Sequence, residues 1–163
     1  CRQYMPGGQP VLVVVCSVGG KHAEKDGWQA VDVKPDSLKN FVEHFQSNRE
    51  KIRQKLKVTR ERHGKVVMLG AGHIGSLFLN LHDLGGFLDC VVDDDARKSG
   101  LFLPGSCLPI QPFSTLAGIN DLFVLTSVNP AVEERVIQRW RRQNPSAVFE
   151  SIFPQSSRSI LSH

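Results

Sequence analysis

The residues with the clearest chemical potential form a glycine-rich segment in the middle of the chain. Gly70, Gly72 and Gly75 fit the pattern G-x-G-x-x-G, directly between an apolar run and a helix-forming segment. In that setting the first glycine allows a tight turn, the second lets a phosphate approach the backbone, and the third lets the helix pack closely on the strand. The segment therefore predicts a nucleotide-binding turn with His73 at its mouth, or inherited architecture that binds nothing.

Further polar groups are expected at the same edge of a sheet. A run of three aspartates, 93–95, ends the second predicted strand, and Asp93 follows Gly75 by 18 residues, near the position where an acid holds a ribose hydroxyl. Asn129 ends the fourth predicted strand, beside the crevice where ligands of open α/β sheets bind. The structural alternatives are a turn cluster for the three aspartates and a plain helix N-cap for Asn129. The candidate substrate- or nucleotide-binding residues are Gly70, Gly72, His73, Gly75, Asp93, Asp94 and Asn129.

Motifs of other reaction types are absent from the sequence. There is no G-K-[ST] after a glycine loop, no G-x-S-x-G and no H-E-x-x-H. The four cysteines form no C-x-x-C pair, and no histidine cluster has metal-ligand spacing, so we expect no metal site. Cys16 and Cys90 lie in apolar runs, which is typical of buried thiols in a reducing compartment, and we expect a cytoplasmic protein. No catalytic residue is identified.

The glycine segment belongs to an alternation of strands and helices. Five short apolar runs predict the strands: 66–69, 88–92, 108–110, 122–128 and 147–153. Helices are expected at 76–84 and from Pro130 onward. This alternation favours a parallel sheet covered on both faces, with the order 3-2-1-4-5. The expected fold class is therefore α/β, a Rossmann-like doubly wound sheet over 64–155, followed at 156–163 by a polar tail that frays.

Two segments precede this sheet. Residues 1–35 contain a β-branched strand at 11–15, and we expect an N-terminal arm or the tail of a preceding domain. Apolar residues at three- and four-residue spacing predict one long helix at 36–63. The side of this helix away from its apolar residues is basic, since eight bases and only two acids lie between Arg49 and Lys65. Such a face binds an anionic partner or is simply solvated, and the lack of interleaved aromatic residues argues against nucleic acid.

The chain as a whole fits one domain with an appendage. It has 163 residues and a net charge of +4, and no apolar run approaches the roughly 18 residues of a membrane span. It begins with Cys1 rather than Met, which suggests a fragment or a processed product.

Several segments occur in the order found in one known family. They are Gly64-Lys65-Val66-Val67, the turn 70–75, Val91-Val92-Asp93-Asp94-Asp95, Lys98-Ser99-Gly100, the run LPGSCLPI at 103–110, and 125–134 with Asn129. Over 36–153, and loosely over 7–20, the chain resembles the C-terminal domain of SAM-dependent C-methyltransferases that act on nucleotide-linked deoxysugars.

The resemblance implies that this domain and an upstream domain of the same enzyme have separate roles. The domain would help to form the cleft for a nucleotide-sugar substrate and would bind no cofactor itself. An upstream methyltransferase domain would hold zinc and S-adenosylmethionine and carry the catalytic residues. Departures from the family pattern, at Pro6, Asp94 and Cys107, leave the sugar open.

Two other functions fit the same residues. One is an NAD(P)-binding module of an oxidoreductase or a redox sensor, in which Asp93 would favour NAD over NADP. The other is a non-catalytic interaction domain whose basic helix docks a partner through salt-sensitive contacts.

Overall fold

The chain divides into two units, Cys1–Lys34 and Pro35–His163. The computed structural model describes residues 2–4, 11–13 and 35–161. In the first unit, β1 (Arg2–Tyr4) and β2 (Val11–Val13) pair antiparallel. The strand predicted at 11–15 is therefore confirmed over its first three residues, and the rest of the expected N-terminal arm lies outside the described residues.

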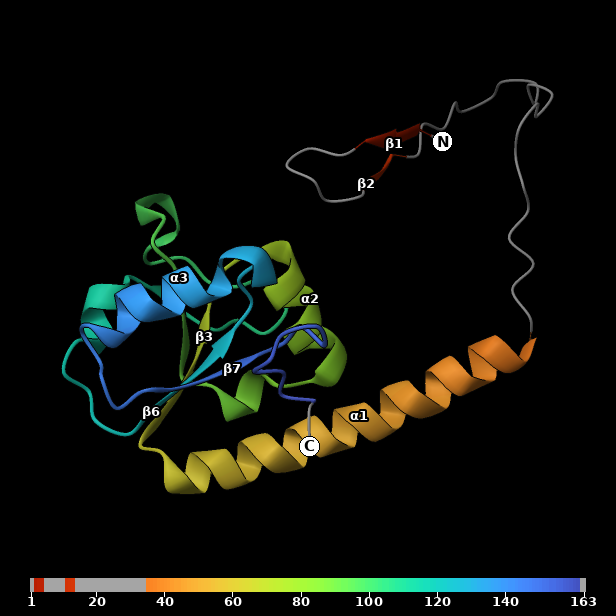
Figure 1. Ribbon diagram of the computed structural model, residues 1–163, viewed down its shortest axis with the longest axis horizontal. Helices are drawn as coiled ribbons and strands as arrows, with labels where there is room; N and C mark the ends of the chain where they lie inside the picture. Colours follow the sequence, from red (N-terminus) through yellow and green to blue (C-terminus); the bar gives the residue numbers. More distant parts are fainter. Residues whose placement is uncertain (1, 5–10, 14–34, 162–163) are drawn as a thin grey trace. The chain divides into compact units, whose positions relative to one another are not determined.

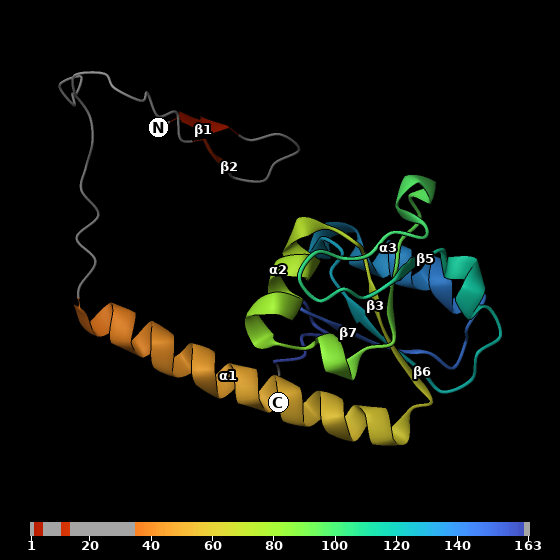
Figure 2. The ribbon, with the colours of Figure 1, turned by 180° about the vertical axis from the view of Figure 1, so that it is seen from behind.

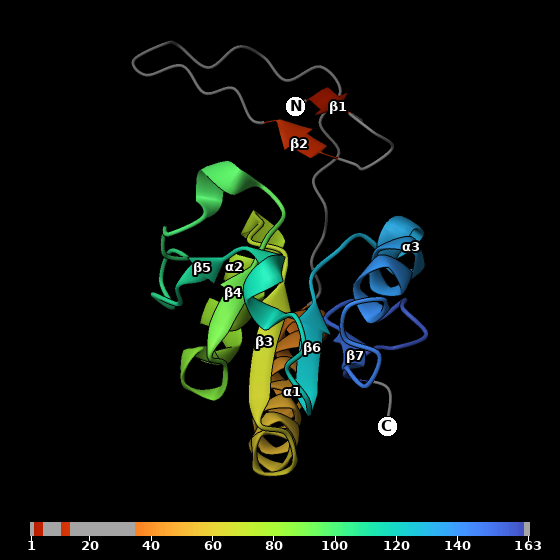
Figure 3. The ribbon, with the colours of Figure 1, turned by 90° about the vertical axis from the view of Figure 1, so that its left-hand side faces the viewer.

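The second unit is built on a five-stranded sheet whose described ladders are all parallel. Its strands are β3 (Lys65–Leu69), β4 (Cys90–Val92), β5 (Ile110–Gln111), β6 (Leu122–Thr126) and β7 (Val148–Ser151). They lie in the order β5-β4-β3-β6-β7, which Figure 3 shows from left to right. Counted from β3, this is the predicted order 3-2-1-4-5, so the Rossmann-like α/β class is confirmed.

Helices cover the two faces of this sheet. The helices are α1 (Pro35–Arg62), α2 (His73–His82) and α3 (Pro130–Arg141). Alternate residues of β3 point to opposite faces because the side-chain period of a strand is two. Val66 and Met68 join the core under α1 and α2, whereas Val67 and Leu69 join the core under α3. Figure 1 shows α3 and α1 on opposite sides of the sheet.

Helix α2 begins three residues earlier than predicted and ends two residues earlier. Gly72 is its N-cap, so the helix starts inside the glycine turn itself. It ends because Asp83 adopts a left-handed conformation with φ of 53°. This early start places the free N–H groups of the first helical turn at the carboxyl edge of the sheet.

The basic residues of α1 contact acids of the same unit. Arg53 lies 2.7 Å from Asp83, and Arg60 lies 2.9 Å from Asp89. Such partly exposed pairs contribute at most about 1 kcal/mol each. The main attachment of the helix is therefore the burial of Ile52 and Leu56, which are 1% and 0% exposed. Within the described residues, no helix is long and apolar enough to cross a membrane.

The C-terminal segment packs on the domain, so the prediction of a frayed tail is wrong for residues 156–161. β7 is an edge strand, and its outward backbone groups need partners. Ser151 donates its N–H to the Arg158 carbonyl oxygen at 2.9 Å and accepts from the Ile160 N–H at 2.8 Å. Ile160 is 3% exposed and belongs to the core under α1. Ile160, with the partly buried Leu161 beside it, thus anchors a stretch that otherwise consists of polar residues.

Short 3-10 helices occur in the connections, namely η2 (Gly85–Phe87), η3 (Ala96–Lys98) and η4 (Phe113–Leu116). Figure 2 shows the long loop that leads from η3 to β5. The third of these short helices, η4, follows β5 in the chain and lies within residues 112–117.

Candidate functional site

Two of the three motif glycines are required by packing within the protein. Gly70 has a φ of +103°, and a Cβ on it would lie 2.7 Å from the Oγ of Ser127. A Cβ on Gly75 would lie 2.8 Å from the same Oγ and 3.0 Å from the Sδ of Met68. Ser127 in turn donates its hydroxyl to the Gly70 carbonyl oxygen at 2.9 Å. These glycines let the turn and α2 pack closely on β3 and on the end of β6.

Gly72 differs from the other two glycines. Its backbone is extended, with φ of −97°, which any residue adopts. A Cβ on Gly72 would meet no atom within 4 Å. The space above it is therefore open, and the protein's own packing does not require a glycine here.

A cavity of about 440 Å³ opens beside Gly72, and we call it the glycine-turn cavity. Its lining consists of Ala71, Gly72, His73, Ser76, Leu77, Asn80, Leu103 and Pro104. The N–H groups of His73, Ile74 and Gly75 start α2 and have no acceptor among the described residues. Together with the helix dipole, they make the N-terminal end of the helix favourable for an anion.

The loop after η3 forms the second wall of this cavity. The hydroxyl of Ser76 and the amide of Asn80 both donate to the carbonyl oxygen of Pro104, at 3.1 and 3.0 Å. These wall residues are not among the substrate- or nucleotide-binding candidates that the sequence predicts. Two signals point to them: Ser76 and Asn80 are four apart on one helix, and Leu103 and Pro104 begin the run LPGSCLPI.

Asp93 lies at the end of β4 and holds the glycine turn in place. Its Oδ2 accepts from the Ala71 N–H at 2.7 Å and from the Lys98 ammonium at 2.9 Å. Its Oδ1 accepts from the Asp95 N–H at 2.9 Å. Burial raises the pKa of this carboxyl, but the hydrogen bonds from Lys98, Asp95 and Ala71 together outweigh it, so the pKa lies below 3.8. Both oxygens are thus engaged within the protein.

The remaining polar candidates do not line the cavity. Asp94 pairs with Arg139 of α3 at 3.0 Å, with its side chain half exposed. The carboxylate of Asp95 caps η3 and accepts from Arg97, whose hydrogen bonds lower the pKa of Asp95 to about 2. Asn129 caps α3 by accepting from the Ala131 N–H at 2.9 Å. The structure therefore brings Gly72 and His73 together at the cavity, whereas the acidic run and Asn129 are not part of its lining.

No three histidine, cysteine, aspartate or glutamate side chains gather in a metal-binding arrangement in the part of the chain that the structure describes. Cys90 is buried, and burial raises the pKa of its thiol.

A comparison with protein families decides the relationship. The family described as C-methyltransferase C-terminal domain matches residues 24–141. The chain belongs to this family. No curated protein matches the chain. In this C-methyltransferase C-terminal domain, the matched residues include the whole lining of the glycine-turn cavity and Asp93. They end before β7 and the C-terminal segment.

Proposed function

We propose that this domain binds the nucleotide part of a nucleotide-sugar-type substrate for a SAM-dependent C-methyltransferase. Gly72 is the observation that carries the proposal. Of the three motif glycines, it alone faces open space, and that space is the glycine-turn cavity. A missing side chain that the packing does not need is explained by the close approach of a ligand to the backbone.

The chemistry of the cavity matches both ends of a nucleotide. The three N–H groups at the start of α2 are placed to donate to a phosphate, and the dipole of the helix favours its charge. Leu77, Leu103 and Pro104 supply an apolar wall against which a flat base can lie. His73, exposed at the mouth, is placed to contact a phosphate oxygen.

The role of the domain in catalysis is to position the substrate. S-adenosylmethionine supplies the methyl group, and we assign its binding to a methyltransferase domain of the same enzyme rather than to these residues. The family resemblance implies a carbanion beside a keto group as the methyl acceptor. The described residues contribute by holding the nucleotide, which fixes the sugar relative to that chemistry.

NAD is the competing ligand for a turn of this kind. An NAD site uses the acid after the second strand to accept from the ribose hydroxyls. Here that acid is Asp93, which already accepts from Ala71, Lys98 and Asp95 and whose side chain is only 14% exposed. This arrangement favours a ligand that does not depend on a ribose–carboxylate contact.

The test is a pair of calorimetric titrations, one with a thymidine-diphosphate sugar and one with NADH. We expect saturable binding of the diphosphate sugar alone. Gly72→Ala should weaken it about ten-fold or more, because the methyl group displaces a phosphate from charge-assisted hydrogen bonds.

Gly64→Ala is the matched control, since a Cβ there also meets no atom within 4 Å and Gly64 lines no part of the cavity. It should leave the affinity unchanged. Binding of NADH alone, or equal affinity of the Gly72→Ala variant for the diphosphate sugar, would overturn the proposal. Absence of binding by either ligand would overturn it for this domain acting on its own.

A further inference from the structure

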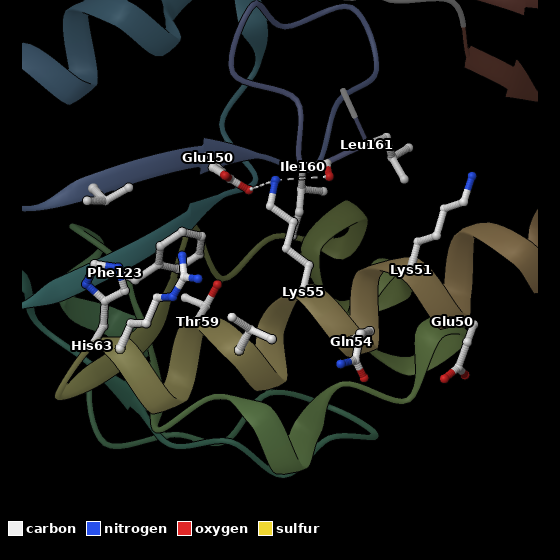
Figure 4. A pocket seen from close by; sticks show the side chains of 13 residues that line it. Glu50, Lys51, Gln54, Lys55, Thr59, His63, Phe123, Glu150, Ile160 and Leu161 are labelled. Carbon is white, nitrogen blue, oxygen red and sulfur yellow. Dashed lines mark hydrogen bonds and ion pairs between the residues drawn. The ribbon is translucent and has the colours of Figure 1, made fainter. Parts of the chain in front are cut away.

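A second and larger cavity lies along α1, and we call it the α1 groove. It has a volume of about 710 Å³, within the range of small-molecule sites. One wall is the face of α1 from Glu50 to Arg62 together with His63, and the other is formed by Phe123, by β7 and by the C-terminal residues Ile160 and Leu161. Figure 4 shows Lys51 at one end of the groove and His63 with Phe123 at the other.

The groove is separate from the glycine-turn cavity and shares no lining residue with it. Its second wall includes Val148, Glu150, Ile160 and Leu161, all of which follow residue 141, where the family match ends. The α1 wall and Phe123 thus lie within the family match, and the rest of the second wall lies outside it.

Lys55 limits what the groove can accept. Its ammonium crosses from α1 to the opposite wall, where it lies 2.9 Å from Oε2 of Glu150 and donates to the Ile160 carbonyl oxygen at 3.4 Å (Figure 4). A helix or strand of another protein cannot lie along the groove without breaking these contacts.

The end of the groove near Phe123 carries polar groups without partners. The Nδ1 atom of His63 is buried and has no hydrogen-bond partner among the residues that the structure describes. The neighbouring guanidinium of Arg62 makes no ion pair or hydrogen bond with any described residue. The guanidinium of Arg62 is exposed and can donate two parallel hydrogen bonds to a carboxylate. The C-terminal dipole of α1 opposes an anion here, but this effect is weaker than such a charge-assisted pair.

The rest of the lining offers an apolar surface. Val58, Val148 and Leu161 provide most of it, because Phe123 and Ile160 also line the groove but are only 2% and 3% exposed. Val148 is 40% exposed although it lies on a strand, so part of this surface is open to solvent. Covering it with methylene groups removes apolar area from water and favours binding.

We infer that the α1 groove binds a hydrophobic monocarboxylate with an extended chain. The carboxylate pairs with Arg62, and the chain runs past Val148 and beside the ammonium of Lys55. No covalent step is involved. The inference does not depend on the nucleotide-sugar site, since no residue is shared.

The test is to titrate the chain with octanoate and decanoate below the concentrations at which they form micelles. Two extra methylenes should tighten binding about ten-fold. Decyltrimethylammonium, which has the same chain and the opposite charge, should bind at least about ten-fold more weakly than decanoate.

Two variants with the same loss of charge separate a site from general attraction. Arg62→Gln should weaken decanoate binding about ten-fold, whereas Lys57→Gln, on the exposed side of α1 and outside the groove, should not change it. Val148→Glu should abolish binding, and thermal unfolding should show that each variant is folded. Gly72→Ala should bind decanoate normally, which distinguishes this result from a failure of the nucleotide-sugar proposal. Equal affinity for the cationic and anionic chains, equal effects of the two charge variants, or no saturable binding would overturn the inference.

Discussion

The carboxylate of Asp93, at the end of β4, accepts a hydrogen bond of 2.7 Å from the backbone N–H of Ala71, in the turn that follows β3. The contact joins the carboxyl ends of two neighbouring strands. It places a residue that the sequence suggests as a ligand contact inside the framework of the turn. The shape of the glycine-turn cavity therefore depends on a side chain that does not line it.

Replacing Asp93 should destabilise the glycine turn and should also weaken any ligand binding at that turn. Asp93→Ala leaves the Ala71 N–H and the Lys98 ammonium without their acceptor, so we expect the free energy of unfolding to fall by about 2 kcal/mol at pH 7. Asp93→Asn keeps one oxygen acceptor and should lose about half as much. Urea unfolding measures both. If both variants have the same free energy of unfolding as the wild type, Asp93 does not hold the glycine turn in place.

The same residue should give a signature at low pH. Because its pKa in the folded protein is lowered below 3.8, the ionised Asp93 stabilises the protein above that pH. This stabilisation is lost as the pH falls through the folded pKa. The stability difference between wild type and Asp93→Asn should therefore shrink below pH 3.8. A difference that stays constant down to pH 2 would contradict this linkage.

His82 should make stability depend on pH near neutrality. It is 9% exposed, and within 2–4, 11–13 and 35–161 its Nδ1 has no hydrogen-bond partner. The centre of its ring lies 5.1 Å from that of Phe45 and 4.6 Å from that of Phe78. Burial and the nearby charge of Arg49 lower its pKa below 6.5. The unfolded chain then binds the proton more tightly, so stability should fall as the pH drops through 6.5.

His82→Phe is the variant that isolates this effect, because it keeps an aromatic ring and removes the titration. Its unfolding free energy should vary less between pH 7.5 and pH 5 than that of the wild type. Identical pH profiles for the two proteins would assign the dependence to other histidines.

Glu133 and Glu134 are adjacent in α3 and should respond very differently to the same substitution. Glu133 is 6% exposed and accepts from the hydroxyls of Thr126 and Ser156. Glu133→Ala leaves both hydroxyls buried without an acceptor and should cost about 2–4 kcal/mol. Glu134 is exposed and pairs with Arg158 at 2.9 Å, so Glu134→Ala should cost at most about 1 kcal/mol. Chemical denaturation of the two variants compares them directly, and equal losses would contradict the assignment.

Ile160 should stabilise the domain although it lies three residues from the end of the sequence. Truncating its buried side chain in Ile160→Ala should lower the free energy of unfolding by about 2–4 kcal/mol. Ser157→Ala, at an exposed position of the same segment, should change it by less than about 0.5 kcal/mol. Thermal unfolding tests both. If Ile160→Ala is as stable as the wild type, the segment does not contribute to the core in solution.

The candidate site could be located from the sequence more readily than it could be interpreted. The G-x-G-x-x-G spacing places Gly70, Gly72 and Gly75 between a strand and a helix, and the structure confirms that position. The spacing does not tell which glycine is open, because the difference depends on Ser127, which is 57 residues from Gly70. Only the neighbouring strand brings that hydroxyl against two of the three glycines.

The sequence by itself determined the alternation of strands and helices, and with it the parallel sheet order, because apolar periodicity and handed crossovers are local or general properties. It did not determine which charged residues form ion pairs or whether the C-terminal segment packs on the domain. The acids that pair with Arg53 and Arg60 are 30 and 29 residues away, and Ile160 finds its place only beside the edge of β7. Such contacts join residues far apart in the chain, so they depend on the packed arrangement of the elements. The tertiary structure therefore decided what the basic helix, Asp93 and the C-terminal segment do.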